Sequence, residues 1–342
     1  MKNAWRFRAA LLAAAAVWGG LWLGPSGAAA ADKVVVGALP LSSSAPLFIA
    51  ADLGYFSAEN LDVDLKLSRA AAAIAVGVAA GDYDVGATGV TASLFNIFMG
   101  EAKLRITADK GRLTPGFHFE SIVASKAAYA AGARGLKDLK GKNFGMTTFG
   151  STFHYILGRL AEAEGMTVAD FQLKPLRGLP NMVSALSSGQ VDFAIFPEPT
   201  GSVAVEKGGG VLLGWADDKL SYQIAVIFYG EKLAANKSVG TRFMKAYIRG
   251  TRYYHDHMLN GPEDSPEFKR GQEIVSKWTQ APASGRRGLI FIDRDGKLLA
   301  DDFARQVDWY ADNGFVPATT KQALPELVDT SFQEAAVKQL GP

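Results

Sequence analysis

The sequence predicts an α/β protein with two lobes and a cleft between them. Residues 185–199 combine the end of a helix, a glycine and a short apolar strand that stops at Pro-Glu-Pro. The same order occurs at residues 76–88, and aligning Gly81 with Gly189 also aligns the acidic residues that follow these glycines. Ligands bind beyond the carboxyl ends of strands in open α/β sheets. Two such units therefore predict two lobes, each supplying one wall of a cleft.

Length and composition agree with this prediction and exclude several classes of protein. A chain of 342 residues with 48% hydrophobic and 20% charged residues can build more than one domain. The formal net charge of +2 argues against a nucleic-acid-binding surface. The sequence has no cysteine, which excludes disulfides, thiol catalysis, cysteine-ligated zinc and a lipid anchor on cysteine.

The first 31 residues have the pattern of an export signal. Lys2, Arg6 and Arg8 precede an apolar stretch at residues 9–24, and an alanine run then offers a cleavage site before Asp32. The apolar stretch is short for a membrane span. We therefore expect residues 1–31 to be a cleaved signal peptide, and the mature chain to be periplasmic and not inserted in the membrane.

Alternating strand and helix patterns fill the first two thirds of the mature chain. Four strands are predicted early, at residues 33–39, 61–67, 85–87 and 104–108. A second series of strands is predicted at residues 121–124, 143–147, 171–175, 191–196 and 211–214. After the strand at 223–229 the pattern becomes helical, at residues 238–259, 267–279, 301–312 and 329–340.

This change of character predicts a discontinuous first lobe. We assign residues 32–118 and 225–342 to the first lobe and residues 119–224 to the second. The chain would then cross between the lobes near residues 117–119 and 222–224, which are the expected hinge strands. Each lobe is expected to be a mostly parallel sheet flanked by helices.

Several segments, in the same order along the chain, resemble a known family. They are Pro46–Val63 (PLFIAADLGYFSAENLDV), Gly81–Gly86 (GDYDVG), Leu136–Gly145, Gly189–Asp192 with Pro197–Pro199, and Val328–Phe332 (VDTSF). Together they resemble the periplasmic substrate-binding proteins of ABC importers in the nitrate/sulfonate/taurine, or NMT1/THI5-like, family. Asn60 stands where family members usually have glycine.

The resemblance implies a type II periplasmic-binding-protein fold that closes on a small solute and delivers it to an ABC permease and its ATPase. It also implies which loops face the ligand. In this sequence these residues are Ser42, Ser43, Ser44, Thr88, Gly89, Val90, Gly150, Ser151, Thr152 and Glu198. His154, just inside the helix that follows Thr152, is a further candidate. Ser44 and Ser151 also suit plain helix N-caps, and Glu198 also suits a helix start.

The residue types in these loops point to an anionic ligand. Three of the four loops lie at predicted helix starts, where free backbone N–H groups favour negative charge. None of the loops carries lysine or arginine, so we expect backbone N–H groups and hydroxyls to hold the headgroup. A small organic anion, such as a sulfonate or carboxylate, is the favoured ligand. A pyrimidine thiamine precursor, an enzyme on the same fold and a sensor protein are the alternatives.

No catalytic or metal-binding constellation stands out in the sequence. His255 and His257 are two apart in a predicted helix and do not share a face, and residues 293–296 lack the remaining positions of a calcium loop and suit a turn. We therefore expect a monomeric binding protein with no cofactor, no metal, no catalytic residues and no nucleic-acid partner.

Overall fold

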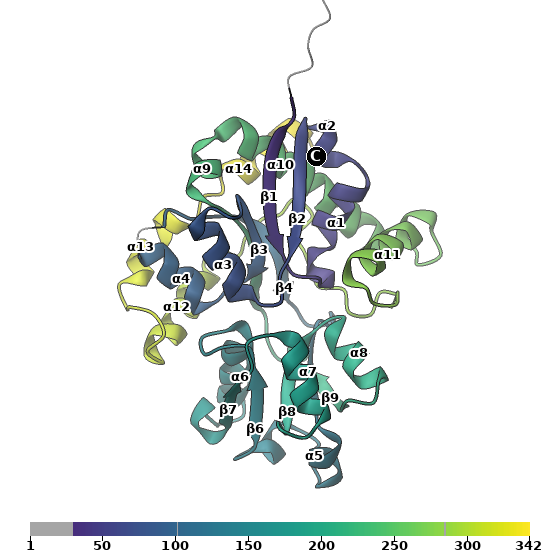
Figure 1. The fold of residues 1–342 in the computed structure, drawn as a ribbon, viewed down its shortest axis with the longest axis vertical. Helices are drawn as coiled ribbons and strands as arrows, with labels where there is room; N and C mark the ends of the chain where they lie inside the picture. The colour runs from purple at the N-terminus through teal and green to yellow at the C-terminus, as the bar shows by residue number, and fades with distance from the viewer. Residues whose placement is uncertain (1–29, 101, 284) are drawn as a thin grey trace, which may run out of the picture. The chain divides into compact units, whose positions relative to one another are not determined.

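The computed structural model describes residues 30–100, 102–283 and 285–342. Within it the strands form two five-stranded sheets, which Figure 1 shows as separate groups. The predicted two-lobed α/β fold is confirmed, and both sheets are mixed, because each holds one strand antiparallel to its neighbours. The expected signal peptide lies almost entirely outside the described residues. None of the described helices is both long and apolar enough to cross a membrane.

The first sheet has the strand order β2-β1-β3-β10-β4. Its strands are β2 (Leu61–Leu67), β1 (Asp32–Ala38), β3 (Val85–Gly89), β10 (Tyr222–Tyr229) and β4 (Arg105–Leu113). β1 pairs in parallel with β2 and β3, whereas β10 is antiparallel to β3 and β4. Thus one strand runs against the rest, and it is the strand that arrives last in the sequence.

The second sheet repeats this topology with the order β7-β6-β8-β5-β9. Its strands are β7 (Gln172–Pro175), β6 (Asn143–Met146), β8 (Phe193–Pro197), β5 (Glu120–Ala124) and β9 (Val211–Trp215). β5 is the reversed strand, antiparallel to both β8 and β9. We call the part of the chain built on each sheet the first and the second lobe.

The acidic residues that follow the aligned glycines make equivalent hydrogen bonds in both lobes. Asp84 Oδ2 accepts a hydrogen bond of 2.8 Å from the backbone N–H of Val35, 49 residues away. Asp192 Oδ2 accepts one of 2.8 Å from the N–H of Asn143, again 49 residues away. Each carboxylate therefore ties the strand that follows it to a neighbouring parallel strand. Gly81 and Gly189 both have positive φ angles, of 83° and 76°, which glycine adopts without strain.

The helices of the first lobe pack on the faces of its sheet or on one another. They are η1 (Ser42–Ser44), α1 (Ala45–Asp52), α2 (Tyr55–Ala58), α3 (Ala71–Ala80), α4 (Ala92–Met99), α9 (Glu231–Ala235), α10 (Lys237–Tyr253) with a π-helical turn (Tyr254–Leu259), α11 (Pro266–Thr279), α12 (Asp302–Asp312), α13 (Thr320–Leu327) and α14 (Ser331–Leu340). Side chains of β10 alternate between two cores. Ile227 and Tyr229 join the core under α10, and Val226 and Phe228 join the core that includes α3 and α4.

The second lobe has shorter helices. They are α5 (Lys126–Ala130), η2 (Leu136–Leu139), α6 (Thr152–Ala163), η3 (Val168–Asp170), α7 (Leu179–Ser187), α8 (Thr200–Glu206) and η4 (Ala216–Asp218). α12 reaches this lobe: the Tyr155 ring of α6 lies 5.3 Å from the Trp309 ring and 5.0 Å from the Tyr222 ring. We expected the C-terminal helices to pack on the first lobe alone. α12 contacts both lobes.

The chain passes between the sheets twice. The first passage lies between the end of β4 at Leu113 and the start of β5 at Glu120, and it includes the predicted hinge residues 117–119. The second lies between η4 and β10. β10 begins at Tyr222, so the chain re-enters the first sheet before residue 225. The lobe boundaries at 118/119 and 224/225 stay a prediction.

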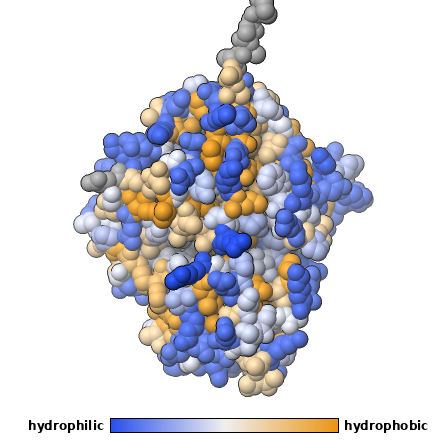
Figure 2. Space-filling model, in the orientation of Figure 1, coloured by the Kyte–Doolittle hydropathy of each residue, from blue (hydrophilic) through white to orange (hydrophobic). Residues whose placement is uncertain are grey.

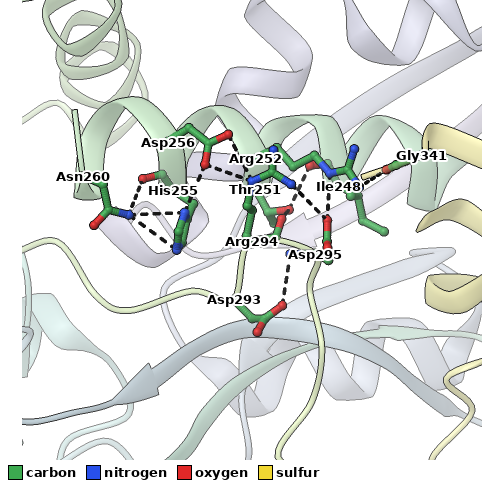
Figure 3. A network of polar contacts seen from close by, with 10 residues as sticks. All are labelled: Ile248, Thr251, Arg252, His255, Asp256, Asn260, Asp293, Arg294, Asp295 and Gly341. Carbon is green, nitrogen blue, oxygen red and sulfur yellow. Dashed lines mark hydrogen bonds and ion pairs between the residues drawn. The ribbon is translucent and has the colours of Figure 1, made fainter. Parts of the chain in front are cut away.

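The turn at residues 293–296 is held by its own backbone and by α10. Asp293 Oδ1 accepts hydrogen bonds from the N–H groups of Asp295 and Lys297, which makes this segment a turn as predicted. Figure 3 shows Arg294 paired with Asp256 and Arg252 paired with Asp295. These pairs attach the turn at residues 293–296 to α10 and to the π-helical turn that follows α10.

We expect Gly250→Ala to destabilise the first lobe strongly. A β-carbon at Gly250 would lie 2.2 Å from the backbone carbonyl oxygen of Pro46, so α10 and α1 would have to separate. Overpacking of this kind costs about 1–3 kcal/mol, which denaturant unfolding would measure. Gly135→Ala is the matched control, since among the described residues no atom beyond its two chain neighbours lies within 4 Å of the added β-carbon. Equal stability of the two variants would contradict the close α1–α10 packing.

Candidate functional site

A pocket lies where the carboxyl ends of the parallel strands of the two lobes meet. The first lobe lines it with Leu39, Leu41, Ser43, Arg69, Ala70, Ala71, Gly89, Lys110, Ile224 and Ala225. The second lobe lines it with Phe119, Glu120, Thr147, Thr152, Phe153, Leu179 and Pro197. The walls are mainly apolar, and a few hydroxyls and three ionisable groups face them. This composition is typical of a small-molecule site.

Lys110 is the basic group inside this pocket. It occupies a β-bulge: Ala225 and Val226 of β10 are adjacent, but they pair with Gly111 and Asp109 of β4, leaving Lys110 without a partner residue. Bulges redirect side chains, and here the bulge accompanies a lysine that lines the pocket. Lys110 is only 1% exposed, and its Nζ donates a 2.9 Å hydrogen bond to Ser43 Oγ. Burial lowers the pKa of Lys110 to about 7, and neighbouring Asp109 opposes this effect.

A buried polar network holds the bulge. Asp109 Oδ1 accepts hydrogen bonds from the N–H of Gly111 and from Gln223 Nε2, and Asp109 Oδ2 accepts one from the N–H of Asp293. The pKa of Asp109 is raised to about 6, because the effect of burial outweighs the opposing effect of the nearby Arg112. Gln223 also donates to the carbonyls of Gly111 and Ala225 across the bulge. The side chains of Asp109 and Gln223 and the backbone of Asp293, from three segments that are distant in the sequence, therefore fix the backbone that presents Lys110.

Glu120 is the acidic group of the pocket and comes from the second lobe. It is 2% exposed, and its Oε2 atom has no hydrogen-bond partner among the described residues. Burial raises its pKa well above the ordinary value, and the carboxyls of Asp217 and Glu198 add to the rise. Asp217 Oδ2 accepts hydrogen bonds from the N–H groups of Phe119 and Glu120. Burial therefore favours the neutral, protonated form of the Glu120 carboxyl group.

We expect Glu120→Gln to stabilise the protein increasingly as the pH rises. The pKa of Glu120 is raised on folding, so above its ordinary pKa the folded state holds a proton that the unfolded state has lost. This costs stability as the pH increases toward the folded-state pKa. Melting temperatures of the variant and the wild type should therefore diverge from pH 5 to pH 8. Exposed Glu326→Gln is the control, and a constant difference for Glu120→Gln would contradict the raised pKa.

Three of the predicted ligand-facing residues line the pocket: Ser43, Gly89 and Thr152. Gly89 and Thr152 come from opposite lobes and are close, because a β-carbon at Gly89 would lie 2.7 Å from Thr152 Cγ2. Phe119, in the expected hinge, and Phe153, next to Thr152, also line it. A side chain at position 89 would therefore meet the opposite wall of the pocket.

Other predicted residues connect the two lobes beside the pocket. Across the lobes, the N–H of Ser42 donates to the Glu198 carbonyl at 3.2 Å. Within the first lobe, Ser42 Oγ donates to the Gly288 carbonyl at 2.5 Å. The Gly150 carbonyl accepts a 2.9 Å hydrogen bond from the N–H of Ala92. The Glu198 side chain accepts from the N–H of Ser202 at the start of α8, and burial raises its pKa to about 7.

The remaining predicted residues do not line this pocket. Ser44 Oγ donates to the Leu39 carbonyl, and Ser151 Oγ caps α6 by accepting from the N–H of His154. Thr88 and Val90, on either side of Gly89 in the sequence, are buried. The His154 ring lies 5.4 Å from the Trp309 ring and 5.0 Å from the Phe315 ring. Burial among these rings lowers the pKa of His154 to about 4.

The loops named from the sequence carry no basic residue, but other parts of the chain bring basic side chains to this pocket. Lys110 and Arg69 line it, and so do Glu120 and Thr147, none of which the sequence analysis singled out. The strand predicted at residues 104–108 ended before Lys110, because the adjacent polar residues Asp109 and Lys110 are typical of a loop. β4 in fact continues to Leu113. A usable signal was the charged run directly after a buried apolar strand, at the strand end where ligands bind.

Sequence comparison assigns the chain to a family. The model of the NMT1-like family matches residues 27–258, most of the chain. The protein therefore belongs to the NMT1-like family. No curated protein matches the sequence.

Solved structures share the fold at low sequence identity. The alkanesulfonate-binding protein SsuA from Xanthomonas axonopodis pv. citri, bound to MOPS, is 16% identical, with a TM-score of 0.69 over 88% of this chain and 99% of that one. The periplasmic nitrate-binding protein NrtA from Synechocystis PCC 6803 is 14% identical, with a TM-score of 0.69 over 91% and 89%. A zinc-bound ligand-binding component of an ABC-type import system from Staphylococcus aureus is 17% identical, with a TM-score of 0.68 over 89% and 99%.

Proposed function

We propose that the protein is an exported solute-binding protein that captures a small organic anion between its lobes and delivers it to an ABC permease. The observation that carries this proposal is the buried ammonium group of Lys110 in the pocket between the lobes. Family membership and the likeness to binding proteins of the same fold support it.

A buried lysine without an acidic partner in contact is costly unless a ligand supplies the missing charge. Lys110 Nζ makes one hydrogen bond within the described chain, to Ser43, and its other N–H groups are free for a ligand. The hydroxyls of Thr147 and Thr152 line the same pocket. An anionic group beside Lys110 would gain charge-assisted hydrogen bonds in a site shielded from water.

The apolar wall supports an organic rather than an inorganic anion. Leu39, Phe119, Phe153 and Pro197 line the pocket together with the polar groups. These side chains can bury the hydrocarbon part of a carboxylate or sulfonate, and each buried methylene adds about 0.8 kcal/mol. Nitrate has no part that would use this wall.

A thermal-shift screen tests the ligand class. Short alkyl carboxylates and sulfonates, nitrate, an aminopyrimidine and an alkylamine are added in turn at equal ionic strength. A ligand at 100 times its Kd stabilises the protein by about 2.7 kcal/mol, which raises the melting temperature measurably. Stabilisation by the amine or the pyrimidine alone would overturn the proposal of an anion. Recovery of the bound solute chemically unchanged would separate a binding protein from an enzyme.

Closure and export are tested separately. A saturating ligand should reduce the radius of gyration in X-ray scattering, because it favours the closed arrangement of the lobes. The hydrogen bonds of Ser42 with Glu198 and of Ala92 with Gly150 join the lobes, and they would break when the lobes open.

N-terminal sequencing of the exported protein should begin near Asp32. Intact Met1 in the soluble fraction would contradict export, and binding to vesicles that contain the matching permease would test delivery.

A further inference from the structure

Two arginines occupy equivalent positions in the two lobes, each just after the edge strand of its sheet. Arg69 follows Ser68, whose N–H donates a 2.8 Å hydrogen bond to the Ala38 carbonyl at the end of β1. Arg177 follows Leu176, whose N–H donates a 2.8 Å hydrogen bond to the Met146 carbonyl at the end of β6. The repeat of the fold therefore places one arginine at the same corner of each lobe.

The two corners lie against each other beside the pocket, which Arg69 lines. A β-carbon at Gly178, the residue after Arg177, would lie 3.5 Å from the carbonyl oxygen of Arg69 and 3.8 Å from its Cβ. Arg69 lines the pocket that holds Lys110, and it also lines an adjoining cavity between the lobes. Figure 2 shows strongly hydrophilic residues, in deep blue, in the middle of the face between the parts that carry the two sheets.

Within residues 30–100, 102–283 and 285–342, neither arginine side chain has a polar or aromatic partner. No hydrogen bond, ion pair or ring contact joins the Arg69 or Arg177 side chain to any residue in the described part of the chain, and both residues are exposed. Arg177 also has a φ angle of 68°, a left-handed conformation that an arginine adopts at a cost. Two unpaired cations from opposite lobes repel each other when the lobes approach, unless an anion lies between them.

We propose that the ligand carries a second acidic group, which binds between Arg69 and Arg177 while the first binds at Lys110. The ligand class is then a small diacid, such as a dicarboxylate or a sulfocarboxylate. This inference rests on the proposed function, and it adds the substrate class. A guanidinium binds a carboxylate through two parallel hydrogen bonds, so a pair of arginines suits an exposed acidic group better than lysines would. The second acidic group also turns the repulsion between the lobes into attraction.

Matched pairs of acids test the inference by calorimetry at fixed ionic strength. Butanoate is compared with succinate, pentanoate with glutarate, and propanesulfonate with 3-sulfopropanoate. The wild type should bind each diacid at least about tenfold more tightly than its monoacid, which corresponds to about 1.4 kcal/mol. In the double variant Arg69→Gln/Arg177→Gln this ratio should fall to about one. Lys33→Gln, which removes a charge at the opposite end of β1, should keep the ratio of the wild type.

The outcomes separate this inference from the proposed function. Equal affinities of the wild type for mono- and diacids, or a diacid preference that survives in the double variant, would overturn the inference and leave anion capture standing. If neither kind of acid binds to the wild type, the proposed function itself fails. Arg69→Lys/Arg177→Lys should keep part of the preference, because the charges remain while the paired hydrogen bonds are lost.

Discussion

Replacing Lys110 by methionine should abolish anion binding and, at the same time, stabilise the ligand-free protein. Binding should weaken by at least about 100-fold, because a charge-assisted hydrogen bond in a buried site is worth several kcal/mol. Burial lowers the pKa of Lys110 from 10.5 to about 7, which means that the folded protein holds the charged ammonium at a cost. Methionine has a similar length and no charge to bury. We therefore expect a gain of roughly 1–4 kcal/mol in the free energy of unfolding, measured in denaturant.

The pH dependence identifies the source of this gain. The folded-state pKa of Lys110 lies below its unfolded value, so the burial cost is fully present below about pH 7 and declines as the pH rises toward 10.5. The stability difference between Lys110→Met and the wild type should shrink over this range. Lys33→Met, at an exposed site, should change neither binding nor stability appreciably. A destabilised Lys110→Met variant that still binds anions would contradict the role given to Lys110.

Anion binding should be coupled to proton uptake above neutral pH. Free Lys110 has a pKa of about 7, and an anion beside it favours the charged form. At pH 8 the ligand-free lysine is about 90% neutral, so binding takes up close to one proton, whereas at pH 6 it takes up only about a tenth of one. Affinity should fall about tenfold per pH unit above 7 until the pKa of the bound state is reached.

Calorimetry in buffers of different ionisation enthalpy measures this uptake directly as the slope of the observed enthalpy. Glu120 faces the same pocket and also has a raised pKa, so Glu120→Gln serves as the control. If Lys110 is the group that takes up the proton, the slope persists in Glu120→Gln. A slope of zero at pH 8 in the wild type, with binding intact, would show that Lys110 stays charged in the empty pocket or does not contact the anion.

The order and type of most elements could be predicted from sequence, because local patterns encode them. Buried parallel strands are continuous apolar runs, and glycine with positive φ ends a helix. The alignment of Gly81 with Gly189 identified two units whose carboxylates, Asp84 and Asp192, make the same hydrogen bond. Loops at strand ends that contain serine and threonine likewise indicated Ser43, Gly89 and Thr152, which line the pocket.

The charged centre of the pocket depended on tertiary structure. Asp109 and Lys110 form a polar run that by itself predicts a loop, yet both are buried. They are buried because Gln223 and Asp293, 114 and 184 residues away from Asp109 in the sequence, satisfy the Asp109 carboxylate and hold the bulge open. No local pattern records these partners.

The position of His154 also depended on tertiary structure. The sequence placed it one turn into the helix behind a ligand-facing loop, which is where α6 begins. Trp309 and Phe315, from the C-terminal segment, surround its ring and keep it out of the pocket lining. Helical periodicity determined which residues share a face of α6. Which face meets the ligand and which meets another helix was decided by apolar burial between segments distant in the chain.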